Sequence, residues 1–215
     1  MSVTPPRAEA PAWQAAAPAG YRGPRIALIH GFLAGAHMQR HLLRFLREAG
    51  YPDTTLYGNH RSPAAIAREL APAVAEGRDI VLVGYSQGGF QVMKVARELE
   101  RAGVPVAFLL SFAAGGVGRW HPAQWGFDPR HLPGNVHRCV NVFSLVDHMG
   151  CDQPHERNLV RPNGRAELVE NIALPETLAV DHVAMARCYP AGRVHPAVRE
   201  HILARLLSEL ARLQP

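Results

Sequence analysis

Ser86 is the residue of this chain whose surroundings point most directly to chemistry. It lies in residues 84–88 (GYSQG), which fit the pattern Gly-x-Ser-x-Gly, and a further glycine follows at Gly89. In this pattern a strand ends in a sharp turn, a serine lies at the tip, and a helix leads away. The flanking glycines let strand and helix pass close together. The spacing therefore predicts a serine nucleophile at the carboxyl end of a strand.

The residues around Ser86 fit the elements that this pattern requires. Residues 80–83 form a continuous apolar run, as expected of a buried parallel strand. The apolar residues of 90–99 recur at helical spacing and lie on roughly one face. The N-terminus of such a helix directs backbone N–H groups toward the position where an oxyanion would form.

A serine hydroxyl becomes a useful nucleophile only beside a histidine base, which in turn needs an orienting carboxylate. After a serine turn of this kind, the acid and then the histidine follow in chain order. His182, in residues 178–186 (LAVDHVAMA), lies before the last predicted helix and is the base that we expect. His195 is the alternative, although its position beside Pro196 is typical of a helix start.

Asp147 is the expected acid because it lies just past the carboxyl end of the predicted strand over residues 136–145. Sites on parallel sheets form at the carboxyl ends of the strands. Asp152 is the second choice, and Asp128 is a third if its loop folds inward. Asp181 is excluded because side chains adjacent in sequence rarely reach the required geometry.

Two backbone N–H groups are expected to bind an oxyanion. One belongs to Gln87, directly after the serine, and the other to Phe32, in a loop that follows a predicted strand. Gly31 lets that loop turn closely. Loss of one such donor typically costs about 3 kcal/mol of transition-state stabilisation.

Strands and helices alternate along the chain, which predicts an α/β fold with a parallel sheet covered on both faces. The strands are expected at residues 25–29, 54–57, 80–83, 104–112, 136–145 and 168–174. The last of these segments is nearly as compatible with a helix. Helices are expected at residues 37–49, 63–76, 90–99 and 196–213.

A long loop over residues 115–134 interrupts this alternation and contains Trp120, Trp125 and Phe127. Loops of this length are usually functional or disordered, and three large aromatic residues favour a packed loop. Our hypothesis is that this loop overhangs Ser86 and that, with these aromatic residues, it forms part of an apolar pocket for an acyl or leaving group. A simple cap over the core explains the same composition.

Length and composition narrow the class of protein. With 215 residues, the chain is expected to form an irregular arm over residues 1–24 and one domain over residues 25–215. The net charge of +5 comes from scattered arginines without a dense basic run, which argues against nucleic-acid binding. Three cysteines without Cys-x-x-Cys spacing argue against a structural zinc site or a disulfide framework.

No sequence feature indicates a secretory signal or a membrane span, so a cytoplasmic location is expected. Nothing in the sequence calls for a metal or a cofactor.

The chain resembles the alpha/beta-hydrolase family over residues 25–213. The resemblance is carried by residues 30–32 (HGF), residues 84–89 (GYSQGG), Asp147 and His182. It implies the family's eight-stranded sheet, here reduced to about six strands, without a separate cap domain. Lipases, esterases and thioesterases are the most similar members.

The resulting expectation is a serine hydrolase that cleaves a carboxylic ester or thioester of a small molecule or a lipid through an acyl-enzyme. Two alternatives remain: a non-catalytic binding protein with the same fold, and an acyltransferase that uses the same site. The sequence leaves the acyl chain length and the oligomeric state open.

Overall fold

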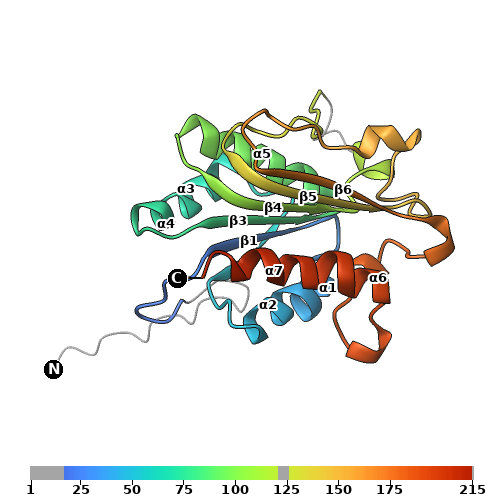
Figure 1. Cartoon of the computed structure of the whole chain (residues 1–215), viewed down its shortest axis with the longest axis horizontal. Helices are drawn as coiled ribbons and strands as arrows, with labels where there is room; N and C mark the ends of the chain where they lie inside the picture. Colours follow the sequence, from blue (N-terminus) through green and yellow to red (C-terminus); the bar gives the residue numbers. More distant parts are fainter. Residues whose placement is uncertain (1–16, 121–125, 215) are drawn as a thin grey trace.

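A six-stranded parallel sheet forms the centre of the molecule in the computed structural model, which describes residues 17–120 and 126–214 (Figure 1). The strands are β1 (Arg25–His30), β2 (Thr54–Gly58), β3 (Ile80–Tyr85), β4 (Val106–Phe112), β5 (Val136–Ser144) and β6 (Leu168–Leu174). Their order is β2-β1-β3-β4-β5-β6. The predicted α/β class and strand number are confirmed, and the ambiguous segment 168–174 is a strand.

Strand β3 lies inside the sheet, and the candidate nucleophile, Ser86, directly follows its last residue. Its six residues are all buried, and Val83 pairs with Leu28 of β1 and Leu110 of β4. Because all pairings are parallel, every strand ends at the same edge of the sheet. Loops far apart in the sequence therefore meet there.

Helices cover both faces of the sheet (Figure 1). One face carries α3 (Pro63–Leu70), α4 (Pro72–Ala75) and α5 (Gln87–Arg101). The other carries α1 (Gly35–Met38), α2 (Arg44–Glu48), α6 (Pro196–Val198) and α7 (Arg205–Ala211). The π-helical turns η1 (Gln39–Leu43) and η8 (Arg199–Ala204) join α1 to α2 and α6 to α7. The helix expected over residues 63–76 is divided before Pro72, whose missing N–H interrupts the helix.

The remaining helical elements of the described residues are short 3₁₀ turns. They are η2 (Gly116–Trp120), η4 (His155–Asn158), η5 (Glu176–Leu178), η6 (Ala184–Ala186) and η7 (Ala191–Arg193). Between β4 and β5, the described residues contain only η2 as a regular element, so they hold no separate cap domain. Within the described parts of the chain, no helix has the length and hydropathy to cross a bilayer.

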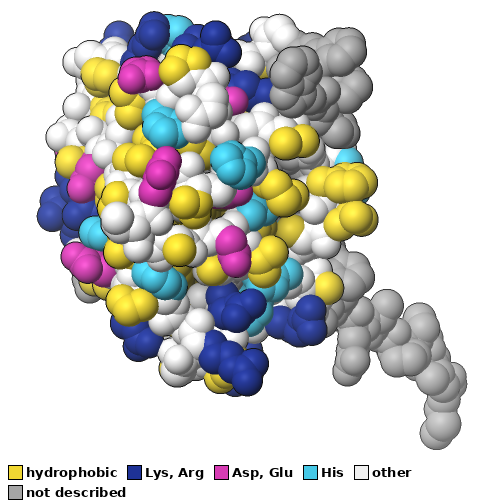
Figure 2. Space-filling view, turned by 90° about the vertical axis from the view of Figure 1, so that its right-hand side faces the viewer, with side chains coloured by type: hydrophobic (Ala, Val, Ile, Leu, Met, Phe, Trp, Pro, Cys, Tyr) yellow, Lys and Arg dark blue, Asp and Glu magenta, His cyan; other side chains and the backbone are white. Residues whose placement is uncertain are grey.

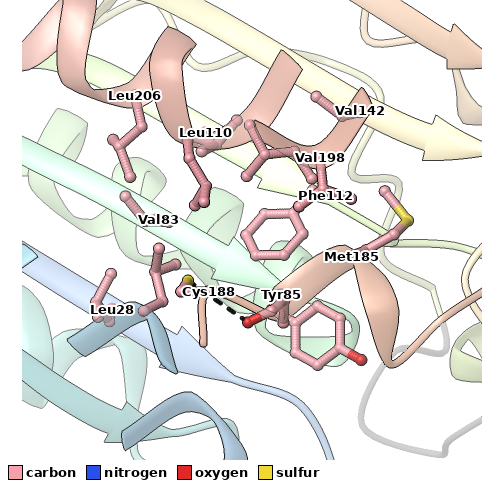
Figure 3. Packing of buried hydrophobic residues seen from close by; sticks show 14 of the residues in the cluster. Leu28, Val83, Tyr85, Leu110, Phe112, Val142, Met185, Cys188, Val198 and Leu206 are labelled. Carbon is pink, nitrogen blue, oxygen red and sulfur yellow. Dashed lines mark hydrogen bonds between the residues drawn. The ribbon is translucent and has the colours of Figure 1, made fainter. Parts of the chain in front are cut away.

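Two hydrophobic clusters, one on each face of the sheet, form the core. In the cluster shown in Figure 3, Val83, Leu110 and Phe112 of the sheet pack against Val198 and Leu206 of the C-terminal helical segment. Each fully buried side chain of this size contributes on the order of 2 kcal/mol. This packing fixes the strand ends and the loops that follow them.

His41 fastens the chain that follows β6 to the first helical segment. Its Nδ1 accepts hydrogen bonds from the backbone N–H groups of Cys188, at 3.2 Å, and Tyr189, at 3.1 Å. An accepting ring nitrogen carries no proton. Burial, together with His37, Arg187 and Arg40, lowers the pKa of His41 from 6.5 to about 4 and keeps the acceptor available. The neutral imidazole thereby holds the segment just downstream of His182.

This contact predicts a stability that depends on pH through His41. A histidine whose pKa is lower in the folded chain binds protons preferentially when unfolded, so its effect on stability appears only at acidic pH. We expect the free energy of unfolding to fall as pH drops from 6.5 to about 4. His41→Asn keeps an acceptor oxygen near the Nδ1 position but cannot titrate, so it should lose less stability over this range.

Urea unfolding at the two ends of this pH range measures the difference. His60→Asn, which replaces an exposed histidine, serves as the control and should follow the wild type. Equal decreases in the free energy of unfolding for wild type and His41→Asn would show that His41 is not the source of the pH dependence.

Candidate active site

Ser86 lies at the tip of a tight turn between β3 and α5. Its backbone has φ 57° and ψ −126°, a conformation that an L-residue rarely adopts and that costs about 1–3 kcal/mol. Two hydrogen bonds hold the turn: the Ser86 N–H donates to Phe112 O at 3.0 Å, and the Gly89 N–H donates to Ser86 O at 2.9 Å. The turn therefore continues the ladder between β3 and β4 and presents the hydroxyl beyond the sheet edge.

Three glycines make this turn possible because each lies where a Cβ would collide with its surroundings. A Cβ at Gly84 would overlap the Gly88 carbonyl, and one at Gly88 would overlap the Ile29 carbonyl. A Cβ at Gly31 would lie 2.6 Å from the Ser86 Cβ. The loop after β1 is thus pressed directly against the serine.

The structure brings Ser86, His182 and Asp147 together from three separate parts of the chain. His182 Nε2 lies 3.1 Å from Ser86 Oγ, and its Nδ1 lies 2.7 Å from Asp147 Oδ2. The His182 side chain is 11% exposed and that of Asp147 is 1% exposed. One imidazole therefore connects a serine hydroxyl to a buried carboxylate, an arrangement that can serve as a nucleophile, a base and an orienting acid.

Both oxygens of the Asp147 carboxylate have partners. Oδ1 accepts hydrogen bonds from the N–H groups of Met149, at 3.0 Å, and Gly150, at 2.9 Å, while Oδ2 faces His182. A side chain at Gly150 would collide with Oδ2. The turn after β5 thus fixes the orientation of the carboxylate and stabilises its negative charge.

The other candidate acids have different partners. Asp152 forms an ion pair with Arg119 and accepts the Gly116 N–H at 3.0 Å. Asp128 pairs with Arg130 at 2.7 Å. Both of these carboxylates form ion pairs that hold loop segments together. Among the three candidate acids, Asp147 alone contacts His182.

The alternative base, His195, caps a helix. Its Nδ1 accepts the Ala197 N–H at 3.1 Å at the start of α6. His30, next to Gly31, has its Nδ1 2.7 Å from the Gly31 carbonyl oxygen and lines a different, polar cavity of about 660 Å³. Neither histidine contributes to the pocket that contains Ser86.

The two expected oxyanion donors flank the serine. Gln87 begins α5, so its backbone N–H has no acceptor within the helix. Its side chain is turned away toward Asn59, whose Nδ2 donates to Gln87 Oε1 at 2.5 Å. Phe32 follows Gly31 in the loop packed against Ser86.

An open pocket of about 390 Å³ lies over Ser86 and is mostly apolar. Its apolar lining comes from Phe32, Leu33, Ala34, Val117, Met149 and Val183. Leu33 is 86% exposed and Phe32 is 66% exposed, which is unusual for such side chains. Figure 2 views the molecule from the side of the strand ends and shows hydrophobic side chains and histidines mixed on this face.

Of these apolar lining residues, Phe32 was expected at the site as an oxyanion donor, and Val117 belongs to the loop that was expected to form part of the pocket. The other four were not expected. A usable signal was present, because Met149 and Val183 stand within two positions of Asp147 and His182, and Phe32 and Leu33 follow the Gly31 loop.

Of the three aromatic residues expected to line the pocket, the structure describes the side chain of Phe127 alone. Phe127 packs under the cations of Lys94 and Arg97 on α5, which lie 4.9 and 4.5 Å from its ring centroid, and it is absent from the pocket. Trp120 ends η2, but its side chain, like the whole of Trp125, lies outside the described part of the structure. The placement of Phe127 there is explained by cation–π contacts, which the loop's composition did not reveal.

The described residues show no group of three or more His, Cys, Asp or Glu side chains that could hold a metal ion. Cys139, Cys151 and Cys188 are free and buried. Burial raises the thiol pKa of Cys139 and of Cys188 to about 12, so both remain protonated near neutral pH.

Comparison with solved structures identifies the fold, although sequence comparisons find no match. No protein-family model and no curated protein matches this chain. Among solved structures, it is similar to an esterase from Pyrobaculum calidifontis, with 14% identity, a TM-score of 0.58, and coverage of 90% of this chain and 78% of the other.

Two further structures are similar over nearly their whole length. A putative alpha/beta hydrolase of unknown function from Agrobacterium tumefaciens has 17% identity, a TM-score of 0.57, and coverage of 93% of this chain and 92% of the other. The type II thioesterase BorB from the borrelidin biosynthetic cluster has 14% identity, a TM-score of 0.51, and coverage of 93% and 98%. With its six-stranded parallel sheet and its serine turn after β3, this chain therefore has the alpha/beta-hydrolase fold.

Proposed function

We propose that this protein is a serine hydrolase that cleaves a carboxylic ester or thioester through an acyl-enzyme intermediate. The observation that carries the proposal is the hydrogen-bonded series from Asp147 through His182 to Ser86, with separations of 2.7 and 3.1 Å. The strained serine turn supports it as well, since such strain is kept where it serves function.

In the first half of the reaction, Ser86 Oγ attacks the acyl carbon while His182 Nε2 takes the hydroxyl proton. Asp147 holds the imidazole through Nδ1 and stabilises the imidazolium that forms. The N–H groups of Phe32 and Gln87 donate to the oxyanion of the tetrahedral intermediate. Its collapse breaks the bond to the leaving alcohol or thiol, which receives the proton from His182.

In the second half, His182 takes a proton from water, and the resulting hydroxide attacks the acyl carbon bound to Ser86. The ester bond to Ser86 breaks, its oxygen regains the proton, and the carboxylic acid leaves. These steps use only groups of this chain, the substrate and water.

The apolar lining of the 390 Å³ pocket supports a substrate with a hydrocarbon acyl or alcohol group. Structures with this fold include an esterase and a type II thioesterase, so oxygen and sulfur esters both belong in the proposal. The pocket is open to solvent at exposed Leu33 and Phe32, which suits substrates from small esters to lipid acyl esters.

Hydrolysis of p-nitrophenyl esters from acetate to palmitate tests the proposal. Ser86→Ala should lower kcat/KM for every ester by at least about 10³-fold, because the nucleophile is lost while the fold remains. The wild-type rate should rise from acidic toward neutral pH, since the base acts in its neutral form.

Ser208→Ala, an exposed serine on α7, is the matched control and should keep full activity. Full activity of Ser86→Ala would refute the proposed nucleophile.

Met149 offers a test of the acyl pocket. Its side chain is 58% exposed and lines the pocket, while its contact with Asp147 uses only the backbone N–H. Met149→Ser should therefore leave the carboxylate in place and weaken binding of longer chains. Burial of one methylene contributes about 0.8 kcal/mol. If two methylenes of the acyl chain lose their apolar contact, kcat/KM for octanoate should fall roughly tenfold relative to acetate.

Leu159→Ser is the control, because Leu159 is an exposed apolar residue that does not line this pocket. If Met149→Ser lowered the rates for acetate and octanoate equally, the acyl chain would have to lie elsewhere.

A further inference from the structure

Tyr85, the residue before the serine, touches His182 in two ways. Its hydroxyl donates a hydrogen bond to the backbone carbonyl oxygen of His182 at 2.9 Å. Its ring lies against the imidazole, with 5.0 Å between the ring centroids and 33° between the planes. One side chain therefore contacts both the main chain and the ring of the proposed base.

Tyr85 is itself held rigidly. It is the last residue of β3, is paired with Phe112 in the β4 ladder, and is only 2% exposed. Its ring packs on that of Phe112 with centroids 5.2 Å apart, as Figure 3 shows within the buried cluster. Burial and the nearby acidic residues Asp147 and Asp181 raise the pKa of its hydroxyl well above the usual range, so the hydroxyl remains a donor.

His182, in contrast, lies on irregular chain. It stands between η5 and η6, three residues after Ala179, whose φ is 49°, and directly before Val183, which is 49% exposed. Its ring is fixed through Asp147, but that contact alone leaves the position of the backbone open. Asp181 accepts hydrogen bonds from the N–H groups of Ala184, at 2.7 Å, and Met185, at 3.2 Å, but both lie within the same loop. The Tyr85 hydroxyl joins the backbone of His182 to a rigid strand of the sheet.

We propose that Tyr85 is a positioning residue that sets the distance between His182 and Ser86. Because Tyr85 and Ser86 are consecutive, the end of β3 carries both the nucleophile and the group that locates its base. The hydroxyl fixes the His182 backbone, and the ring fixes the tilt of the imidazole. The kinetic part of this inference rests on the proposed function.

The test separates the two contacts. Tyr85→Phe removes the hydroxyl and keeps the ring, while Tyr85→Met removes both and fills much of the space. With a soluble short-chain p-nitrophenyl ester, Tyr85→Phe should lower kcat roughly tenfold with KM changed less than twofold, because small displacements of a base are costly. Tyr85→Met should lower kcat further. The acidic limb of the pH–rate profile should move in both variants.

Tyr57→Phe is the matched control. Tyr57 is also a buried tyrosine at a strand end, and its hydroxyl accepts a hydrogen bond from Arg25 at 3.3 Å, away from the serine pocket. It should keep the kcat and the pH profile of the wild type. Unchanged kcat and pH profile in Tyr85→Phe, or a loss confined to KM, would overturn the inference.

A second readout does not require activity. The proton between His182 Nδ1 and Asp147 can be followed by NMR in wild type, Tyr85→Phe and Tyr57→Phe. Its resonance should shift in Tyr85→Phe alone. If no ester is cleaved but this shift occurs, the proposed function fails and the positioning role stands; if the resonance is unchanged, the positioning role fails.

Discussion

The close approach of backbone around Ser86 is the constraint on which the rest of the site depends. The serine has a positive φ that L-residues rarely adopt, and Gly84, Gly88 and Gly31 each lie where a Cβ would collide with a neighbouring group. These contacts join β1, β3 and α5 within a single turn. A conformation that costs about 1–3 kcal/mol persists only because the buried sheet around it determines the path of the chain.

The parallel sheet explains how groups 96 and 35 residues apart come to share one hydrogen-bonded series. β3 and β5 end at the same edge of the sheet with β4 between them, so Ser86 and Asp147 follow strand ends that are one strand apart. His182 reaches them on a loop that Tyr85 fastens at the His182 carbonyl and His41 fastens further along the chain at Cys188. The apolar pocket then forms where these loops leave hydrophobic side chains without cover.

The serine turn and the strand pattern were predictable because both depend on short-range chemistry: glycines where chains cross closely, and apolar runs where strands are buried. Segment 168–174 was ambiguous because its residues are only partly buried, which weakens the periodic signal. The pocket lining was only partly predictable, since neighbours of the site residues could be expected near it, but which side chains face the pocket depends on how each loop folds. Phe127 illustrates this, because cations on α5 hold it away from the serine.

The central claim is that Ser86 is an activated nucleophile. Incubation of the folded protein with a fluorophosphonate, followed by peptide mass spectrometry, tests it directly, because such reagents modify a serine activated by a base. The account predicts a single adduct on Ser86, with labelling slowed strongly in His182→Ala. An adduct on another serine, no adduct at all, or labelling that is unchanged in His182→Ala would contradict it.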